Sequence, residues 1–290
     1  MRRKRTTQVL AVVLVVVAVV ALLPSLLNAL PSSLPSRFRR EARARLERPT
    51  AVPVVSEADL AHLPDPVRRY LLRAGVVGKP RVRNFRASFR GELRAKPDGP
   101  FMPFHAEQAS FFEPRARLFL LQARLGILPF VAFHRYVGSA ATMQVKAASV
   151  ATVVDAKGPQ MNQSETVTLL NDMCILAPAT LIDGDVRWEA LGPHSVKAVF
   201  SNAGNRIASV LFFNERDELV NFQSDDRYQS ADGKTYTLYR WSTPVRDYRT
   251  FGGVTLASHG DASWRMPSGE LEYGRFDLLR IEYNVGGEGP

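Results

Sequence analysis

The feature that most constrains this chain is a helical stretch in the middle of a long series of strand-like segments. Residues 162–183, NQSETVTLLNDMCILAPATLID, keep a helical spacing, whereas the segments on both sides alternate with the period of β-strands. Asn162 can cap the helix with Glu165 reaching back, and Pro178 ends it and starts a second short turn. One face carries Val167, Leu170 and Cys174 with Met173 beside it, and another face carries Glu165, Thr168 and Asp172. The stretch predicts a helix between two runs of strands.

The flanking segments predict antiparallel strands joined by short turns. In residues 84–96 apolar or small side chains take the odd positions and polar side chains the even ones, which is typical of a half-buried strand. Residues 116–126 and 206–214 are apolar at both sets of positions, so both faces of the sheet are covered there. We expect an α+β fold that is mainly β. An N-terminal transmembrane helix would precede a curved antiparallel sheet of about ten or eleven strands, an incomplete barrel plugged by short helices.

The folded domain begins after a linker that contains prolines. Residues 47–55 form this linker, and we expect one half-barrel domain over 56–290. Near its start, residues 65–75 predict a short helix with Asp65 as the N-cap and Gly75 as the C-cap. Its apolar face consists of Val67, Tyr70, Leu71 and Ala74. Such a face predicts packing against a larger element.

The net charge of +10 comes mainly from the N-terminal region. Residues 1–50 carry ten basic and two acidic residues, a net charge of +8, so only +2 remains for residues 51–290. A nucleic-acid-binding domain needs a basic face on its folded part. The nearly neutral body therefore argues against nucleic acid as a partner.

Residues 1–30 predict a membrane anchor. An unbroken apolar run of 15 residues extends from Val9 to Leu23 after the basic start MRRKR, and the apolar character continues to Leu30. No small-x-small cleavage pattern follows, so we expect an uncleaved signal-anchor in the inner (cytoplasmic) cell membrane, with the bilayer as partner. We expect a single-pass protein with its domain outside the cytoplasm, although a strict count of flanking basic residues favours the reverse orientation.

Residues 31–55 predict a basic juxtamembrane linker. Phe38, Ala42 and Leu46 recur at helical spacing among arginines, which is typical of an amphipathic helix lying on anionic headgroups. A solvated basic stalk is the alternative interpretation.

The sequence lacks the motifs of common enzymes and cofactor sites. It has no GxSxG elbow, no phosphate-binding GxxxxGK[ST], no GxGxxG after a strand and no HExxH. We expect no cofactor and no metal site. Cys174 is the only cysteine, so an intrachain disulfide is excluded. Asp172 lies two positions before it on a different helix face, so we expect Cys174 to be a buried small hydrophobe rather than a nucleophile.

An acid cluster is the candidate polar site. Its members are Glu165, Asp172, Asp225, Asp226 and Arg227. A hydrolase-type enzyme built on these acids is the third functional alternative. Asp225 and Asp226 are neighbours in a predicted strand and face opposite sides, which favours local salt bridges over a general acid–base pair.

Several blocks of the sequence carry a resemblance to a known family. LPDPVRRYLLRAGVVGKPRVRNFR, MNQSETVTLLNDMCILAPATLID, VNFQSDDRY, WSTPVRDYRTFGGVTL and YGRFDLLRIEYN resemble, in the same order, an uncharacterised bacterial domain-of-unknown-function family. The resemblance covers about residues 60–284. The family is similar in architecture to the lipoprotein-carrier (LolA-like) half-barrels, which implies a curved sheet with an apolar cavity for acyl chains. The family has no established catalytic residues to transfer.

The leading hypothesis is a membrane-anchored, non-catalytic domain that binds an apolar ligand, such as a lipid or an acyl chain. The cavity is expected to be lined by Val167, Leu170, Met173, Trp188, Phe212 and Trp264. The alternative is an interaction module for an acidic protein or a membrane surface, using the cationic strand face of Arg86, Arg90 and Arg94. The remaining question is whether the polar helix face meets water, an arginine or a ligand.

Overall fold

The computed structural model of the chain describes residues 26–46 and 52–286. Six strands precede the central helix: β1 (Asn84–Leu93), β2 (Met102–Phe112), β3 (Arg115–Leu125), β4 (Leu128–Val137), β5 (Ala140–Ala147) and β6 (Ala151–Lys157). Ten follow it: β7 (Val186–Gly192), β8 (Ser195–Asn202), β9 (Asn205–Phe213), β10 (Leu219–Ser224), β11 (Tyr228–Gln229), β12 (Thr237–Leu238), β13 (Arg240–Ser242), β14 (Val245–Phe251), β15 (Val254–Met266) and β16 (Gly269–Tyr283). The predicted number of strands was therefore too low.

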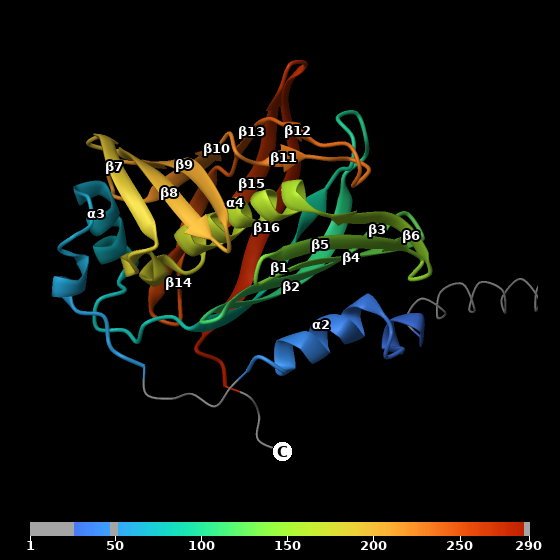
Figure 1. Cartoon of the computed structure of the whole chain (residues 1–290), viewed down its shortest axis with the longest axis horizontal. Helices are drawn as coiled ribbons and strands as arrows, with labels where there is room; N and C mark the ends of the chain where they lie inside the picture. The colour runs from blue at the N-terminus through green and yellow to red at the C-terminus, as the bar shows by residue number, and fades with distance from the viewer. Residues whose placement is uncertain (1–25, 47–51, 287–290) are drawn as a thin grey trace, which may run out of the picture.

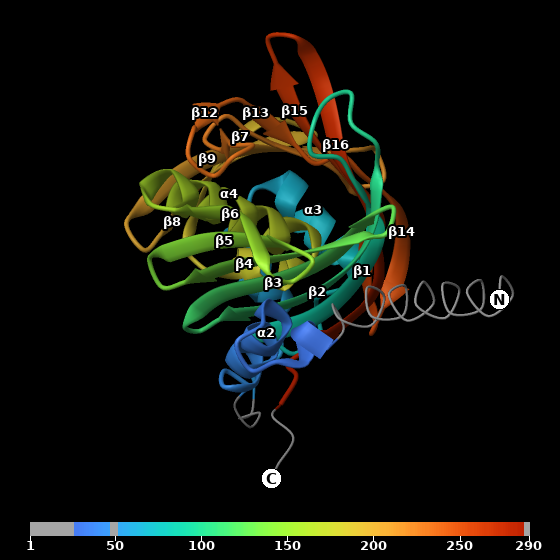
Figure 2. The ribbon, with the colours of Figure 1, turned by 90° about the vertical axis from the view of Figure 1, so that its right-hand side faces the viewer.

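Fourteen of these strands form one antiparallel sheet, and β11 and β12 pair separately. The order is β6-β5-β4-β3-β2-β1-β16-β15-β13-β10-β9-β8-β7, with β14 also paired to β15. The two halves of the chain join where β1 pairs with β16, and Arg90 there contacts Asp277 at 3.3 Å. The sheet curves strongly, so that it encloses α4 and α3 on its concave side (Figures 1 and 2). The predicted mainly β fold, a curved antiparallel sheet filled by helices, is confirmed.

The central helix connects the two edges of this sheet. β6 and β7 are consecutive along the chain but lie at opposite ends of the strand order. Between them α4 (Pro159–Ile175) and the 3-10 helix η2 (Pro178–Ile182) cross the concave side (Figure 2). A long open sheet leaves its concave apolar surface uncovered, and the connecting helix covers part of it.

The start of α4 differs from the predicted start. Gly158, at a φ of 106°, precedes the helix, and Pro159 occupies its first turn, where a missing N–H costs nothing. The predicted cap at Asn162 is wrong, because its side-chain oxygen accepts a hydrogen bond from the backbone N–H of Ala141 at 2.8 Å. Glu165 does not reach back to the helix start either, since it binds Arg117 of β3. The end before Pro178 is as predicted.

The helix over residues 65–75 is confirmed as α3 (Asp65–Ala74), preceded by the 3-10 helix η1 (Glu57–Leu60). Its N-cap is Pro64 rather than Asp65, and Gly75 ends it in the left-handed conformation at a φ of 74°. The predicted apolar face is buried against β8, β15 and η2. Within it the Tyr70 hydroxyl donates to the carbonyl oxygen of Cys174 at 2.7 Å, which ties α3 to the end of α4.

One helix lies outside the curve. α2 (Leu34–Arg43), in the segment expected to be a linker, packs on the outer face of β3 and β4 (Figure 2). Phe38 and Ala42 are buried there against a second apolar cluster that includes Phe133. The apolar side of this helix therefore contacts protein rather than headgroups, while Arg39, Arg40 and Arg43 are exposed.

The predicted membrane anchor, residues 1–30, lies mostly outside the described part of the chain, which begins at residue 26. Within residues 26–46 and 52–286, no helix has both the length and the apolar character needed to cross a membrane.

Candidate functional site

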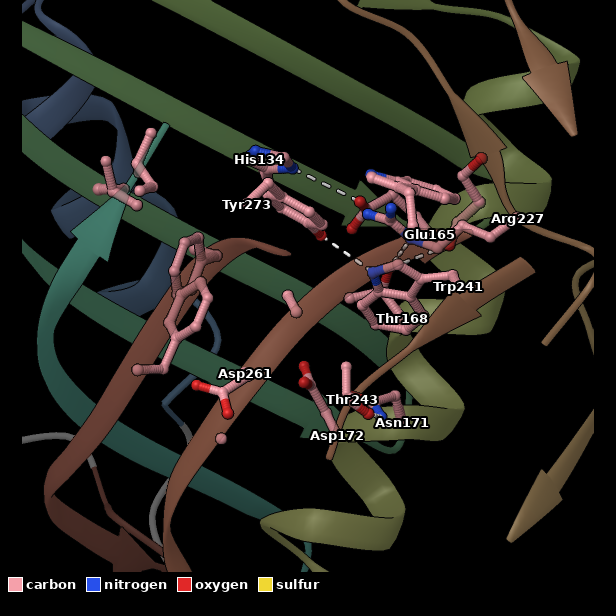
Figure 3. A pocket seen from close by; sticks show the side chains of 18 of the residues that line it. His134, Glu165, Thr168, Asn171, Asp172, Arg227, Trp241, Thr243, Asp261 and Tyr273 are labelled. Carbon is pink, nitrogen blue, oxygen red and sulfur yellow. Dashed lines mark hydrogen bonds and ion pairs between the residues drawn. The ribbon is translucent and has the colours of Figure 1, made fainter. Parts of the chain in front are cut away.

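A pocket of about 430 Å³ lies between α4 and the concave face of the sheet (Figure 3). Its walls come mainly from β1, β13, β15 and β16, whose inward positions carry aromatic and aliphatic side chains. They include Phe89, Leu93, Trp241, Trp264, Leu271 and Phe276. The part of the sheet formed by these four strands therefore gives the pocket a mainly apolar wall, while β2, β3 and β4 add the polar side chains of Gln108, Arg117 and His134.

The helix side of the pocket is polar. α4 presents Ser164, Glu165, Thr168, Asn171 and Asp172 to it, at the three- and four-residue spacing of one helix face. Polar groups withdrawn from water need hydrogen-bond partners, and this face has them. The polar face of α4 formed by Glu165, Thr168 and Asp172 therefore contacts arginine side chains.

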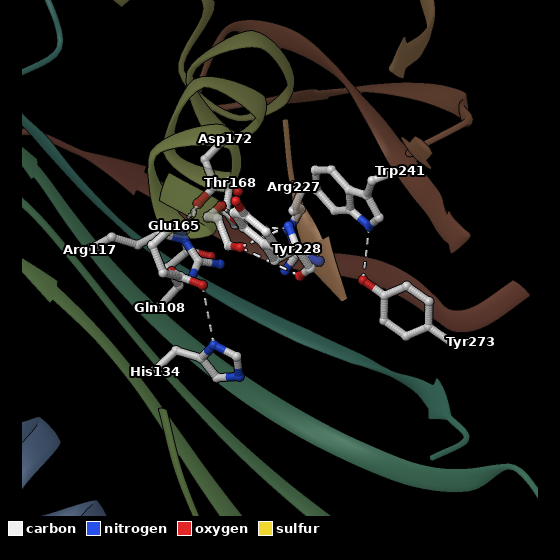
Figure 4. Close-up of polar contacts among 11 residues, drawn as sticks. Gln108, Arg117, His134, Glu165, Thr168, Asp172, Arg227, Tyr228, Trp241 and Tyr273 are labelled. Atoms are coloured by element: carbon white, nitrogen blue, oxygen red, sulfur yellow. Dashed lines mark hydrogen bonds and ion pairs between the residues drawn. The ribbon is translucent and has the colours of Figure 1, made fainter. Parts of the chain in front are cut away.

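Arg117, at the start of β3, is the centre of the polar contacts (Figure 4). Its Nε donates to Asp172 Oδ2 at 2.5 Å, and its Nη1 donates to Glu165 Oε2 at 3.2 Å. Gln108 of β2 donates to the same Asp172 oxygen at 2.7 Å, and His134 Nδ1 lies 3.4 Å from Glu165 Oε1. A buried arginine thus holds against the sheet two buried carboxylates that lie about two turns apart on α4.

The two carboxyl groups differ in their pKa values because they share one arginine. Burial raises the pKa of Glu165, but Arg117 and His134 outweigh burial, and the pKa falls to about 2. Burial also raises the pKa of Asp172, and here Arg117 does not fully compensate because Glu165 adds a like charge. Burial lowers the pKa of Arg117, but the two carboxylates raise it above its ordinary value. Arg117 is therefore charged and fixed.

A second arginine lies among the aromatic walls. The guanidinium carbon of Arg227 is 4.4 Å from the ring centre of Trp241 and 5.0 Å from that of Trp264. Its Nε donates to Thr168 Oγ1 at 3.2 Å, which connects it to α4. Trp241 in turn donates to the hydroxyl of Tyr273 at 3.0 Å. These contacts join the polar and the aromatic sides of the pocket.

The structure places the expected cavity residues in three groups. Trp264 lines the pocket. Val167, Leu170 and Met173 are fully buried on the opposite side of α4, which packs against strands such as β8 and β9. Trp188 on β7 and Phe212 on β9 are half-buried and lie outside the pocket lining. The expected apolar helix face is thus packed core, and the opposite face of the helix lines the pocket.

The expected polar cluster also divides. Glu165, Asp172 and Arg227 line the same pocket. Asp225 instead pairs with Arg240 at 2.9 Å on the surface, and Asp226 accepts a hydrogen bond from the backbone N–H of Ala208 at 2.6 Å. Asp225 thus forms a salt bridge, whereas Asp226 binds a backbone N–H group instead, and both acids follow the end of β10 rather than lying within it. The sequence did not identify Arg117, Gln108, His134 and Trp241 as site residues. Only Arg117, which immediately precedes the apolar run Leu118–Leu121 of β3, stood out as a charge beside buried positions.

Cys174 is fully buried, as expected, and burial raises the pKa of its thiol well above its ordinary value. It lies on the packed side of α4, away from the pocket. Among residues 26–46 and 52–286, no group of three or more His, Cys, Asp or Glu side chains could hold a metal ion.

The cationic strand face is largely paired with neighbouring groups. Arg90 contacts Asp277, and Arg86 lies opposite Glu282 in the register of β1 and β16. Arg94 donates to the carbonyl oxygens of Glu272 and Pro97, both at 2.7 Å. Acidic residues of β16 therefore accompany this face, which weakens the alternative of a site for an acidic partner.

Comparison with known proteins places the chain in a family. The structure is similar to a DUF1329 family protein from Desulfovibrio piger, with 11% identity and a TM-score of 0.43 over 81% of this chain and 95% of that one. It is also similar to a LolA superfamily protein from Nitrosomonas europaea, with 12% identity and a TM-score of 0.40 over 75% of this chain and 93% of that one. No curated protein matches the sequence. The family model for DUF6544, a family of unknown function, matches residues 53–276, and the chain belongs to that family.

Proposed function

We propose that the pocket between α4 and the sheet binds an apolar ligand such as an acyl chain or lipid, and that the domain is a binding module. The observation that carries this proposal is an open space of about 430 Å³ with aromatic and aliphatic walls, in a place where a helix and a sheet would normally pack closely. Ligand pockets of proteins are commonly concave, mostly apolar and of this size. Removing an alkyl chain from water against such walls supplies the binding energy.

The arrangement of the acids supports a non-catalytic role. A general acid or base works best with a pKa near the operating pH. Glu165 is held ionised by Arg117 and His134, with a pKa of about 2, and Asp172 is bound by Arg117 and Gln108. Both carboxyl groups therefore serve to fix α4 at a set distance from β2 and β3, which keeps the pocket open.

The apolar N-terminal segment supports a membrane tether. Residues 9–23 are uniformly apolar, and α2, which follows closely, is fixed on the sheet by Phe38 and by the ion pair of Glu41 with Arg135 at 2.6 Å. We propose a single-pass anchor in the cell membrane with the domain outside the cytoplasm. A tethered domain would receive or hold its ligand close to the bilayer.

Filling the pocket tests the binding proposal. A neutral apolar dye such as N-phenyl-1-naphthylamine gains fluorescence in an apolar site, and we expect saturable binding by the full chain. Leu271→Trp, in the pocket wall, should abolish it. The matched control is Leu191→Trp, at a 50% exposed position of β7 outside the pocket, which should leave binding unchanged. No saturable binding by the native chain, or equal binding by both variants, would contradict the proposal.

A further inference from the structure

Arg227 has hydrogen-bonding capacity that the fold does not use. Its guanidinium group lies over Trp241 and Trp264, and only its Nε is bound, to Thr168. Among the residues that the structure describes, none accepts a hydrogen bond from either Nη atom of Arg227. Stacking on aromatic faces leaves the edge of the guanidinium plane open, and that edge matches the two oxygens of a carboxylate or phosphate.

The other charged groups of the pocket have partners. Glu165 and Asp172 bind Arg117, and Asp261 binds Arg246 and His259. Of the other arginines, Arg94 is bound to backbone carbonyl groups. Among the described arginines that line this pocket, Arg227 is thus the one with both Nη groups available, and it lies between the polar helix face and the aromatic walls.

We propose that the ligand is an amphiphile with an anionic head, a carboxylate or a phosphate monoester, whose head is bound by the Nη edge of Arg227. Its alkyl chain would extend along the apolar wall formed by Phe89, Leu93 and Leu271. This inference rests on the proposed function, since it assigns a ligand class to the same pocket. A buried charge-assisted pair of this kind is among the stronger polar contacts in proteins.

Competition against the neutral dye tests the assignment. Four amphiphiles of equal chain length are compared on the full chain: palmitate, hexadecyl phosphate, hexadecanol and hexadecyltrimethylammonium. We expect palmitate or hexadecyl phosphate to displace the dye at concentrations about ten-fold or more below those of the alcohol and the cation. The ratio of the two anions distinguishes a carboxylate head from a phosphate head.

Variants of Arg227 separate this inference from the function itself. Arg227→Gln should remove the preference for anions while dye binding remains, and Arg227→Lys should restore part of it. Arg90→Gln, which removes an arginine of β1 that lies outside the pocket lining and pairs with Asp277, should keep the full preference. Equal displacement by the anions and the alcohol in the native chain would overturn the assignment. Absence of dye binding would instead overturn the pocket function.

A different observation carries a second inference, which concerns the end of the sheet next to the N-terminal segment. Large apolar side chains are exposed in three short segments there. They are Leu26 (66% exposed), Leu30 (48%), Leu125 (44%), Ile127 (88%), Leu128 (40%), Val150 (62%) and Val153 (51%). Single exposed apolar residues are ordinary, but a group of seven at one end is the mark of an interaction surface.

Hydrogen bonds hold these segments together. The backbone N–H of Ala148, in the β5–β6 turn, donates to the carbonyl of Pro129, next to the β3–β4 turn, at 2.8 Å. Ser149 of the same turn donates to Asn28 Oδ1 at 2.8 Å. The three segments therefore occupy one end of the molecule, where β3 to β6 meet the start of the α2 region (Figure 1).

We infer that this end, comprising residues 26–30, 125–128 and 150–153, lies in the interfacial layer of the lipid bilayer. The apolar run of residues 9–23 leads directly into Leu26, so the chain brings the surface to the bilayer that the run would enter. Arg124, exposed beside Leu125, adds a cation suited to anionic headgroups. Aliphatic tips with a basic neighbour are typical of surfaces that rest in a membrane interface.

Depth-dependent quenching tests this orientation. Cys174 is buried, so a bimane label on Ile127→Cys reports one site in the full chain reconstituted into vesicles of phosphatidylcholine and phosphatidylglycerol. The control is Leu191→Cys, exposed on the opposite edge strand β7. We expect lipids with nitroxide groups to quench the label at position 127 several-fold more than at position 191. Equal quenching at the two positions, or none at 127, would overturn the inference.

Discussion

The two sides of α4 are both buried, yet they are buried in different ways. On one side Val167, Leu170 and Cys174 pack against the sheet with no exposed surface. On the other, Glu165 and Asp172 are held by Arg117 across from an apolar pocket. The helix is therefore fixed by packing on one side, whereas on the other side ion pairs hold it at a distance from the sheet.

The largest effect is expected from removing the buried arginine. Arg117→Met leaves two carboxyl groups in a buried site without their cation, and should lower the free energy of unfolding by about 3–5 kcal/mol. Urea denaturation measures it. Arg275→Met is the matched control, because Arg275 also bridges two acids, Glu92 and Glu272, but on the surface. It should cost no more than about 1 kcal/mol. An equal loss in the free energy of unfolding for Arg117→Met and Arg275→Met would contradict a special role of the buried arginine.

The next largest effects on stability are expected from alanine substitutions on the two sides of α4. Leu170→Ala opens a cavity in packed core and should cost about 2–5 kcal/mol. Thr168→Ala, two residues earlier on the pocket side, removes the acceptor of a hydrogen bond from Arg227 and should cost about 1 kcal/mol. Thermal and urea unfolding compare them. A Thr168→Ala variant as unstable as Leu170→Ala would show that the pocket side is as closely packed as the other.

The pH dependence of stability should separate the two acids. Glu165 has a folded-state pKa of about 2 against an ordinary 4.5, so its stabilisation is present above pH 4.5 and is lost as the pH falls toward 2. The pKa of Asp172 is raised, so its contribution is present below 3.8 and is lost as the pH rises through the folded-state pKa.

When the pH falls from 5 to 3, Glu165→Gln should therefore lose less free energy of unfolding than the native chain. Asp172→Asn should lose more over the same pH range. Urea unfolding at the two pH values provides the measurement. The same change in slope for both variants would mean that the two carboxyl groups do not share Arg117 as described.

The smallest effect is expected at Cys174. Cys174→Ala removes one buried sulfur from the packed side and should cost about 1 kcal/mol without changing dye binding. In the native chain a thiol reagent should react with Cys174 only on the timescale of unfolding, because the group is fully buried. Fast native labelling, at a rate like that of Ile127→Cys, would contradict this.

Much of the fold could be predicted from periodicity. The alternation in residues 84–96 and the helical spacing in 162–175 are local patterns, and the structure has β1 and α4 there. The strand count was low because residues 206–223 contain two strands, β9 and β10, and residues 232–244 contain two more, β12 and β13. Short strands of two or three residues carry no periodic signal.

The site could be predicted only in part, because its decisive contacts are non-local. The sequence distinguishes the apolar face of α4 from its polar face correctly. The apolar face was expected to line the cavity because the cavity was expected to be apolar, and this expectation was wrong. Glu165 meets Arg117 from 48 positions earlier, and Thr168 meets Arg227 from 59 positions later. These contacts depend on the strand order, which joins β3 and β13 in one sheet although they are more than 100 residues apart in sequence.

Native mass spectrometry of the gently extracted full chain shows whether the space beside α4 holds a ligand. We expect the native chain to carry a bound amphiphile that is released by collisional activation. Leu271→Trp should carry none, while Leu191→Trp should retain it. A native chain that is free of any adduct, or an adduct that persists in Leu271→Trp, would show that the space beside α4 is not a ligand site.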